Sequence, residues 1–248
     1  MLLEGKNSLV TGAGSGIGET TAKRMAAEGA KVLVVDVNDE GGRRVVDEIT
    51  AAGGTALFFH GDVTSAEQMD AMVEFVVETW GGLDLAVNNA GLAETPGLMH
   101  ELTPEAWAKT ISIDLTGTFL CMRAELRQFV KQGGGTIVNT ASGAGLKATP
   151  GLTAYSAAKH GVVGLTRTAA MDYVKKNIRV NAVAPGTILT PAMKGFGDEQ
   201  LAAWSELMPS GRLGTTDEVA AGIVWLLSEQ SSYTTGSILE IDGGYMQA

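Results

Sequence analysis

A tyrosine and a lysine, Tyr155 and Lys159, stand one helical turn apart in the sequence. Residues at this spacing share a helix face, so the lysine ammonium can lie beside the phenol. A free tyrosine, with a pKa of about 10, is a weak base at neutral pH, and a neighbouring positive charge stabilises its phenolate. The pair indicates general acid–base chemistry. The spacing alone also arises by chance, but a serine upstream, Ser142, strengthens the interpretation.

A glycine-rich stretch, residues 11–18 (TGAGSGIG), follows an apolar run and opens a helical pattern. Its glycines allow a tight turn and bring the main chain close to a pyrophosphate, which the helix N-terminus attracts. The glycine spacing differs from the usual G-x-G-x-x-G pattern. We interpret the stretch as a dinucleotide-binding turn, whose candidate residues are Gly12, Ser15, Gly16, Ile17 and Gly18.

Asp36 ends the second apolar run, where a ribose-binding acid is expected. Its carboxylate can accept hydrogen bonds from both ribose hydroxyls of NAD, and it would repel the 2′-phosphate of NADP. Ser15 and Val37 supply no cation to offset that repulsion. The sequence therefore favours NAD. The alternative is that Asp36 only caps the helix that follows.

Residues 88–91 (NNAG) end another apolar run, at the edge where an open α/β sheet binds ligands. The small residues Ala90 and Gly91 would let a ring pass close to the main chain. A plain turn explains Asn and Gly equally well. The motif therefore indicates a ligand site only in combination with the glycine-rich stretch and Asp36.

The elements that must position these residues alternate along the chain. We expect strands at residues 7–11, 31–36, 55–60, 83–88, 136–140, 179–184 and 237–241, and helices at residues 16–28, 41–51, 66–80, 104–132, 154–175 and 216–227. Repeated βαβ units give a parallel sheet with helices on both faces. The prediction is an α/β fold, a single Rossmann-type doubly wound domain over residues 1–248. Residues 190–214 break the alternation, and we interpret them as a substrate lid rather than a packed excursion.

Composition narrows the functional classes. The chain of 248 residues carries a net charge of −10, which argues against nucleic acid and anionic membrane surfaces as partners. It holds no apolar run near the roughly 20 residues of a membrane helix. Its first six residues (MLLEGK) lack the long apolar stretch of a signal peptide, so we expect none. Its single cysteine cannot form an internal disulfide, so we expect a cytoplasmic protein. The three histidines, His60, His100 and His160, show no zinc-type spacing, and no metal site is predicted.

Taken together, the motifs resemble those of the classical short-chain dehydrogenases/reductases over essentially the whole chain. The matching stretches are residues 11–18, Asp62-Val63, residues 88–91, Ser142, Tyr155 with Lys159, Pro185-Gly186 and residues 241–244 (IDGG). The resemblance implies a seven-stranded parallel sheet and a homotetramer, to which the apolar stretch 238–246 would contribute. It also implies NAD-dependent hydride transfer between a secondary alcohol and its ketone.

The resemblance further implies a role for each catalytic residue. Tyr155 would be the acid/base, and Lys159 would stabilise its phenolate and hold the nicotinamide ribose. Ser142 would hydrogen-bond the substrate oxygen and stabilise charge that develops on it.

Cofactor contacts are implied in the same way. Asp62 and Val63 match the pair that contacts adenine, and Asn89 matches the position beside the adenosine ribose. Ile188 and Thr190 match positions that hold the carboxamide and phosphates of the cofactor, following the Pro185-Gly186 motif.

Asp114 departs from the family pattern. Residues 113–117 (IDLTG) place it where the family usually has an asparagine that holds a water in a proton relay. An aspartate can still accept a hydrogen bond, but it brings a charge and lacks the amide donor. Ionised, it would favour a charged Lys159. The expected change concerns the relay and leaves the Ser–Tyr–Lys chemistry in place.

Three functions compete on this evidence. The leading one is an NAD-dependent alcohol dehydrogenase or carbonyl reductase for a small-molecule substrate, an apolar or cyclic secondary alcohol or its ketone, with pocket candidates Leu92, Leu146, Leu152, Met193, Trp204 and Met208. A 3-oxoacyl-carrier-protein reductase would prefer NADPH and need basic residues near the site, which Asp36 and the acidic balance oppose. A non-catalytic nucleotide-binding protein on the same fold is opposed by the complete Ser142, Tyr155 and Lys159 set.

Overall fold

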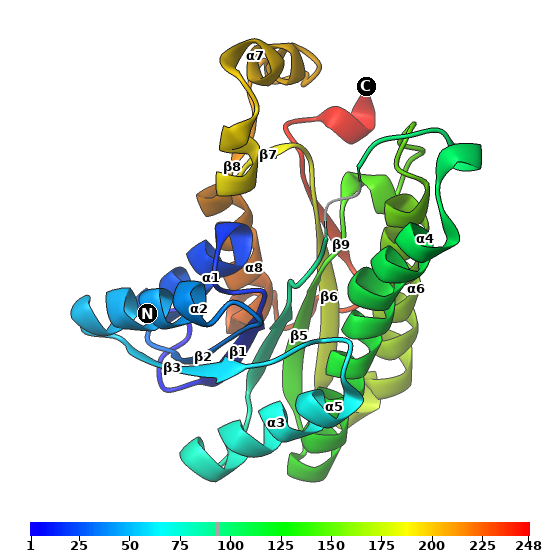
Figure 1. Cartoon of the computed structure of the whole chain (residues 1–248). Coiled ribbons are helices and arrows are strands. Elements are labelled where there is room, and N and C mark those ends of the chain that lie inside the picture. Colours follow the sequence, from blue (N-terminus) through cyan, green and yellow to red (C-terminus); the bar gives the residue numbers. More distant parts are fainter. Residues whose placement is uncertain (93–94) are drawn as a thin grey trace.

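Seven parallel strands form the centre of the protein in a computed structural model that describes residues 1–92 and 95–248 (Figure 1). The strands are β1 (Asn7–Thr11), β2 (Lys31–Asp36), β3 (Thr55–His60), β4 (Leu85–Asn88), β5 (Gly135–Thr140), β6 (Ile178–Pro185) and β9 (Ile238–Ile241). They run in the order β3-β2-β1-β4-β5-β6-β9, and β1 pairs Leu9 with Leu33 of β2 on one side and Ala86 of β4 on the other. The predicted seven-stranded parallel sheet is confirmed.

Helices cover both faces of this sheet (Figure 1). One layer holds α1 (Gly16–Ala27), α2 (Asp39–Ala51) and α8 (Thr216–Leu227), and the other holds α3 (Ala66–Trp80), α4 (Pro104–Thr110), α5 (Thr118–Gln132) and α6 (Thr153–Tyr173). Among the described residues, we find no helix with the length and apolar character needed to cross a membrane.

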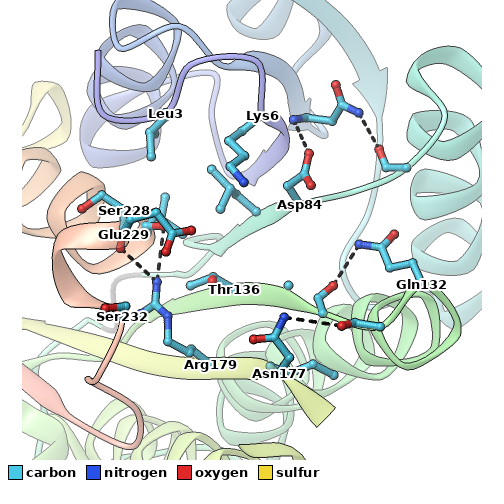
Figure 2. A pocket seen from close by; sticks show the side chains of 18 of the residues that line it. Leu3, Lys6, Asp84, Gln132, Thr136, Asn177, Arg179, Ser228, Glu229 and Ser232 are labelled. Carbon is cyan, nitrogen blue, oxygen red and sulfur yellow. Dashed lines mark hydrogen bonds between the residues drawn. The ribbon is translucent and has the colours of Figure 1, made fainter.

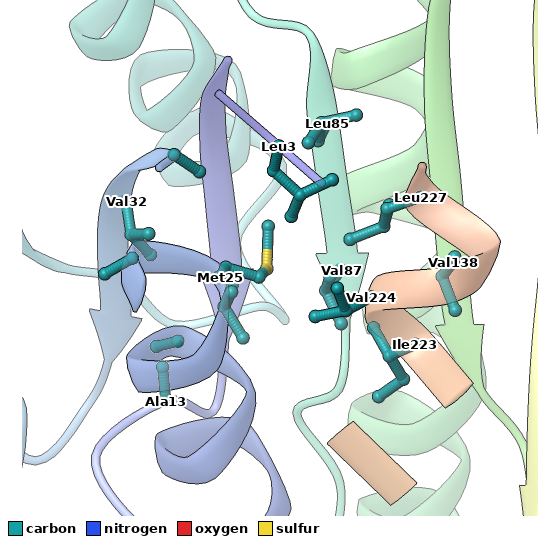
Figure 3. Close-up of a cluster of buried hydrophobic side chains, with 14 of the residues drawn as sticks. Leu3, Ala13, Met25, Val32, Leu85, Val87, Val138, Ile223, Val224 and Leu227 are labelled. Carbon is teal, nitrogen blue, oxygen red and sulfur yellow. The ribbon is translucent and has the colours of Figure 1, made fainter. Parts of the chain in front are cut away.

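Side chains of β2 pack alternately into two hydrophobic clusters, one on each face of the sheet. Val32 and Val34 of β2 face the cluster under α1 and α8, and Leu33 faces the cluster under α3 and α5. Figure 3 shows the first cluster, where Met25 of α1 and Ile223 of α8 meet the sheet. Because both faces are covered, the strands read as nearly continuous apolar runs, which is why the sequence located them.

The expected helix at residues 104–132 contains a local change of winding. Seven residues, Ile111–Gly117, form a π-helical turn between α4 and α5. Such turns insert an extra residue per turn and occur often at functional sites. Hydrophobic periodicity over this range did not reveal it.

Residues 190–214 are more ordered than the sequence suggested. They hold a short 3₁₀ turn, Pro191–Gly195, and a further helix, α7 (Asp198–Glu206), which projects beyond the rest of the fold (Figure 1). Two short strands, β7 (Ile188–Leu189) and β8 (Gly214–Thr215), pair in parallel at the base of the segment. The sequence analysis did not predict α7, β7 or β8.

A cavity of about 850 Å³ opens at the amino ends of the strands (Figure 2). Arg179 projects there and donates to the main-chain oxygens of Leu226 (2.9 Å), Ser228 (3.2 Å) and Thr234 (3.2 Å). It thus satisfies carbonyl groups left unpaired at the end of α8. Gln132 similarly donates to the oxygens of Leu83 and Gly134. These polar side chains join loops of the fold.

A buried polar network joins the sheet to α5 and α6. Glu125, with no exposed surface, accepts from Asn88 Nδ2 at 3.0 Å, and Asn88 also donates to Asn139 Oδ1 at 3.0 Å. Asn139 in turn donates to Thr166 Oγ1 at 2.9 Å. The second carboxylate oxygen of Glu125 has no hydrogen-bond partner in the described part of the chain. Burial raises the pKa of this carboxyl from its ordinary value to about 8.

This pKa links stability to pH. The unfolded chain releases the Glu125 proton near its ordinary pKa, whereas the folded protein keeps it to about pH 8. Between these values the unfolded state binds fewer protons, so stability falls as pH rises.

Glu125→Gln should remove this dependence, because an amide has no such proton to lose. Relative to wild type, the variant should gain up to about 1.4 kcal/mol of stability per pH unit between about pH 5 and pH 8. Urea unfolding at fixed protein concentration measures this. Glu74→Gln, on the exposed face of α3, should follow wild type. Parallel stability curves for Glu125→Gln and wild type would contradict the prediction.

Candidate active site

The carboxyl ends of β1 and β4 border a cleft of about 450 Å³. The strand order reverses between these two strands, which is where open α/β sheets bind ligands. Many of the predicted cofactor residues line it, namely Gly12, Ser15, Gly16, Ile17, Asp36, Asp62, Val63, Asn89, Ala90, Gly91 and Thr190. Val37, Gly61, Leu92, Ile113, Pro191 and Ala192 line it as well, and sequence reasoning did not assign them to the cofactor.

Contacts with the end of β4 hold the glycine-rich turn in place. Thr11 Oγ1 accepts from the main-chain N–H groups of Asn89 (3.1 Å) and Ala90 (3.2 Å), and Asn89 Nδ2 donates to the oxygen of Gly12 (3.2 Å). Gly12 has φ +63°, and a Cβ there would lie 2.8 Å from Ala90 Cα. Only glycine satisfies both constraints. The two motifs therefore form one unit, with Asn89 facing the turn.

Main-chain donors fix the Asp36 carboxylate at the mouth of this cleft. Its Oδ2 accepts from Gly14 N at 2.8 Å and its Oδ1 from Asn38 N at 2.9 Å. The helix that follows is capped by Asn38, whose Oδ1 accepts from Gly41 N at 3.2 Å. The alternative that Asp36 only caps this helix is therefore wrong.

Arg44 approaches the same turn and was missed in the sequence analysis. It donates to the oxygen of Gly14 at 3.1 Å. The same guanidinium pairs with Glu19 at 2.6 Å and Glu48 at 2.7 Å, and these contacts raise the pKa of Arg44 and lower that of Glu19. Lys23 pairs with the same two carboxylates, so two cations and two anions form one cluster beside the turn.

Six predicted cofactor residues lie outside the lining of the cleft: Tyr155 and Lys159, which are described below, and four others. Gly18 lies beneath the turn, where a Cβ would be 2.2 Å from the oxygen of Gly12, and Gly186 lies where a Cβ would be 2.9 Å from Asp242 Cα. Pro185 ends β6, and Ile188, only 6% exposed, packs into the core.

A buried ion pair stands behind the cleft. Lys159 Nζ lies 3.2 Å from Asp114 Oδ1 and donates to the main-chain oxygen of Thr140 at 3.1 Å. Asp114 Oδ2 accepts from Leu92 N at 3.0 Å. Asp114 has no exposed surface and Lys159 is 3% exposed. Each of these buried charges stabilises the other, because burying either one without its partner would be energetically unfavourable.

Close packing of α6 against the π-helical turn creates this pair. A Cβ on Gly161 of α6 would lie 2.6 Å from Leu115 Cδ1, so the missing side chain lets the turn approach the helix. A Cβ on Gly91 would similarly lie 2.8 Å from Asp114 Oδ1 and 3.4 Å from Lys159 Nζ. The glycine of residues 88–91 therefore makes room for the ion pair.

Tyr155 and Ser142 flank the same region. Lys159 Nζ lies 5.4 Å from the centroid of the Tyr155 ring, as the helical spacing predicted. Ser142 follows β5 and its Oγ accepts from Ala144 N at 3.2 Å, capping the short 3₁₀ turn Gly143–Gly145. This contact uses a lone pair, so the hydroxyl hydrogen can still be donated.

Sequence reasoning missed three supporting groups in this site. They are the Thr11 hydroxyl, the Thr140 oxygen that accepts from Lys159, and the Leu92 main-chain N–H. Two of them act through the main chain, which no residue type signals.

The arrangement fits a dinucleotide. It offers a glycine-rich main chain at the turn, a fixed carboxylate at one end and a phenol–ammonium pair deeper in the fold. Within residues 1–92 and 95–248, no three His, Cys, Asp or Glu side chains cluster so that they could hold a metal ion.

Known proteins resemble this chain along almost its full length. Residues 12–246 match the family model described as enoyl-(acyl carrier protein) reductase. Cyclohexanol dehydrogenase from Acinetobacter sp. (strain SE19) is 45% identical over 97% of this chain and 94% of its own length. A 2,5-dichloro-2,5-cyclohexadiene-1,4-diol dehydrogenase from Sphingobium indicum is 42% identical over 98% of both chains. The crystal structure of levodione reductase superposes with a TM-score of 0.94, at 38% identity over 99% of both chains.

Asp114→Ala should destabilise the protein by about 3–5 kcal/mol, because it leaves the buried Lys159 ammonium without its carboxylate. Asp114→Asn keeps the shape and the acceptor for Leu92 N, so its cost should be smaller. Urea unfolding at pH 7 compares the two. Adding Lys159→Met to Asp114→Ala removes the unpaired charge and should restore part of the loss. Additive costs in the double variant would show that the pair does not couple.

Proposed function

Because the chain belongs to the classical short-chain dehydrogenase/reductase family, we propose that it is an NAD-dependent dehydrogenase of a cyclic secondary alcohol, with Tyr155 as acid/base. It is an oxidoreductase that interconverts a secondary alcohol and its ketone. The observation that carries the proposal is the position of Lys159 behind the dinucleotide cleft, next to the Tyr155 ring.

In the proposed oxidation, this chain's residues handle the proton and the substrate oxygen. The Tyr155 phenolate removes the proton of the alcohol, and the Ser142 hydroxyl donates to the same oxygen and stabilises its developing charge. NAD, when bound, supplies the acceptor for the hydride that leaves the carbinol carbon. In the reverse direction Tyr155 returns the proton to the ketone oxygen.

Lys159 has two tasks in this mechanism. Its ammonium stabilises the phenolate of Tyr155 and is placed to donate to the nicotinamide ribose. Asp114 fixes the position of that ammonium and balances its charge. The field that Lys159 exerts on the phenol is therefore weaker than that of an unpaired lysine. In this chain a carboxylate thus replaces the amide that the family usually has at the proton relay.

The residues support NAD as the cofactor. For the cofactor's adenosine end, the cleft presents the carboxylates of Asp36 and Asp62, and none of its described lining side chains is cationic. Arg44 is committed to Glu19 and Glu48. A 2′-phosphate at Asp36 would be a like-charge contact without compensation.

A cyclic substrate is supported by the relatives, since two are named for six-membered cyclic alcohols. Of the predicted pocket residues, Leu92 lines the cofactor cleft and Met208 is only 6% exposed. Trp204 packs edge-on against Phe196 at 5.0 Å within residues 190–214. We propose that residues 190–214 cover the substrate as a lid hinged on β7 and β8.

The proposed state is a cytoplasmic homotetramer with no nucleic-acid or membrane partner. Large apolar side chains on the outer surfaces of α5 and α6 support assembly, since Phe119 is 46%, Val130 41% and Met171 75% exposed. Light scattering that gives about four chain masses would support it, and a monomer would refute it.

Tyr155→Phe tests the acid/base assignment. It removes the transferable proton and keeps the ring, so folding and NAD binding should survive while turnover of cyclohexanol falls at least about 10²–10⁴-fold. NADH formation with a panel of secondary alcohols measures this. Tyr173→Phe, at the end of the same helix, is the matched control and should keep wild-type turnover. Near-normal turnover in Tyr155→Phe would overturn the mechanism.

Asp36→Ala tests the cofactor assignment. The variant should lose efficiency with NAD and gain efficiency with NADP, because it loses both the ribose acceptor and the like charge. The ratio of kcat/KM for the two cofactors is the measurement. Asp39→Ala, in the exposed first turn of α2, should keep the wild-type preference. Wild-type protein that uses NADP as well as NAD would refute the assignment.

A further inference from the structure

The last residues of the chain lie between two walls of the proposed substrate site. After β9 the chain forms a 3₁₀ turn, Tyr245–Gln247, which lies between α7 and the loops that precede α6 (Figure 1). On one side, a Cβ on Gly244 would lie 3.7 Å from Pro209 Cβ, near the end of the lid. On the other side, a Cβ on Gly143 would lie 3.5 Å from Met246 Sδ and 3.9 Å from Tyr245 Cδ1.

Gly143 directly follows Ser142, so these two side chains border the space that a side chain would occupy at the residue next to the proposed oxyanion donor. Tyr245 and Met246 are both half-buried. They present an aromatic ring and a thioether, which are the surfaces that an apolar ring packs against.

Lys147 fastens this segment to the Ser142 loop. Its Nζ donates to the main-chain oxygen of Tyr245 at 3.1 Å and to that of Ala248 at 3.4 Å. The same ammonium lies 4.3 Å from the centroid of the Tyr245 ring, a cation–π distance. Three contacts from one side chain thus fix both the main chain and the ring.

Asp242 holds the other end of the segment. Its Oδ1 accepts from Gly244 N at 2.9 Å and its Oδ2 from Met246 N at 2.7 Å. The segment is therefore anchored at both ends, and its side chains have a defined place relative to Ser142.

We propose that Tyr245 and Met246 form a wall of the substrate site that limits the size of the alcohol, and that Lys147 is the positioning residue that holds this wall. The inference rests on the proposed function. It goes beyond the proposed function by assigning substrate specificity to residues that do not touch the reacting oxygen or the cofactor.

The test compares kcat/KM for cyclohexanol with that for the bulkier 4-tert-butylcyclohexanol. Tyr245→Ala should raise the ratio of bulky to small substrate at least about tenfold, because it opens space in an apolar wall. Lys147→Met should shift the ratio in the same direction by a smaller factor. In both variants the KM for NAD should stay within about twofold of wild type.

Conservative and matched variants separate positioning from general damage. Tyr245→Phe keeps the ring and should keep the wild-type ratio. Lys176→Met removes another lysine that lies over a tyrosine, 5.5 Å from the Tyr173 ring centroid, and should change nothing. If Tyr245→Ala does not fold, Lys147→Met carries the test.

An unchanged ratio in active Tyr245→Ala or Lys147→Met would overturn the corresponding part of the proposal. An equal shift in Lys176→Met would overturn it too. Wild-type protein that oxidises neither alcohol would instead refute the proposed function, and the inference with it.

Discussion

The buried contact between Asp114 and Lys159 is the constraint around which the site is arranged. A lysine that is 3% exposed must have its charge balanced nearby. Asp114 can do this only because the π-helical turn carries it toward α6, and because Gly91 and Gly161 keep side chains out of the space between. The ammonium is thereby fixed next to the Tyr155 ring. Charge balance and the geometry of the proposed chemistry are thus set by the same pair.

The polar network around Glu125 connects the elements that position Asp114 and Lys159. It joins α5, which follows the π-helical turn, to the ends of β4 and β5 and to Thr166 of α6. Thr166 lies on the helix that carries Tyr155 and Lys159, and Asn88 precedes the residues that line the cofactor cleft. A fully buried network of this kind specifies one arrangement of its elements, since misaligned polar groups would lose their partners. The Glu125 carboxyl of this network is fully buried, and burial favours its protonated, uncharged form.

Sequence predicted the regular part of this molecule well, and the reasons are physical. Strands buried on both faces read as apolar runs, and the glycine-rich turn and the Tyr155–Lys159 spacing each follow from a local geometric need. The π-helical turn, α7 and the pairing of β7 with β8 were not predicted. A π turn keeps a helical pattern of side chains, and α7 has no buried face to give it a period. The supporting roles of Thr140 and Leu92 were also missed, because their main-chain atoms form the hydrogen bonds and residue type does not indicate such contacts.

The residues proposed to carry out the reaction and those proposed to select the substrate lie in different parts of the fold. Groups that would act on the substrate oxygen lie on β5, α6 and the π-helical turn, inside the regular sandwich of helices and sheet. Groups that could contact the rest of the substrate lie on α7 and on the turn at Tyr245, both beyond the carboxyl edge of the sheet (Figure 1). Few contacts of the core depend on these two segments, so they can change with little cost to the fold. In the proposed function, the type of reaction follows from residues whose spacing is readable in the sequence. The proposed choice of substrate follows from segments whose positions depend on tertiary contacts, such as those of Lys147 with Tyr245.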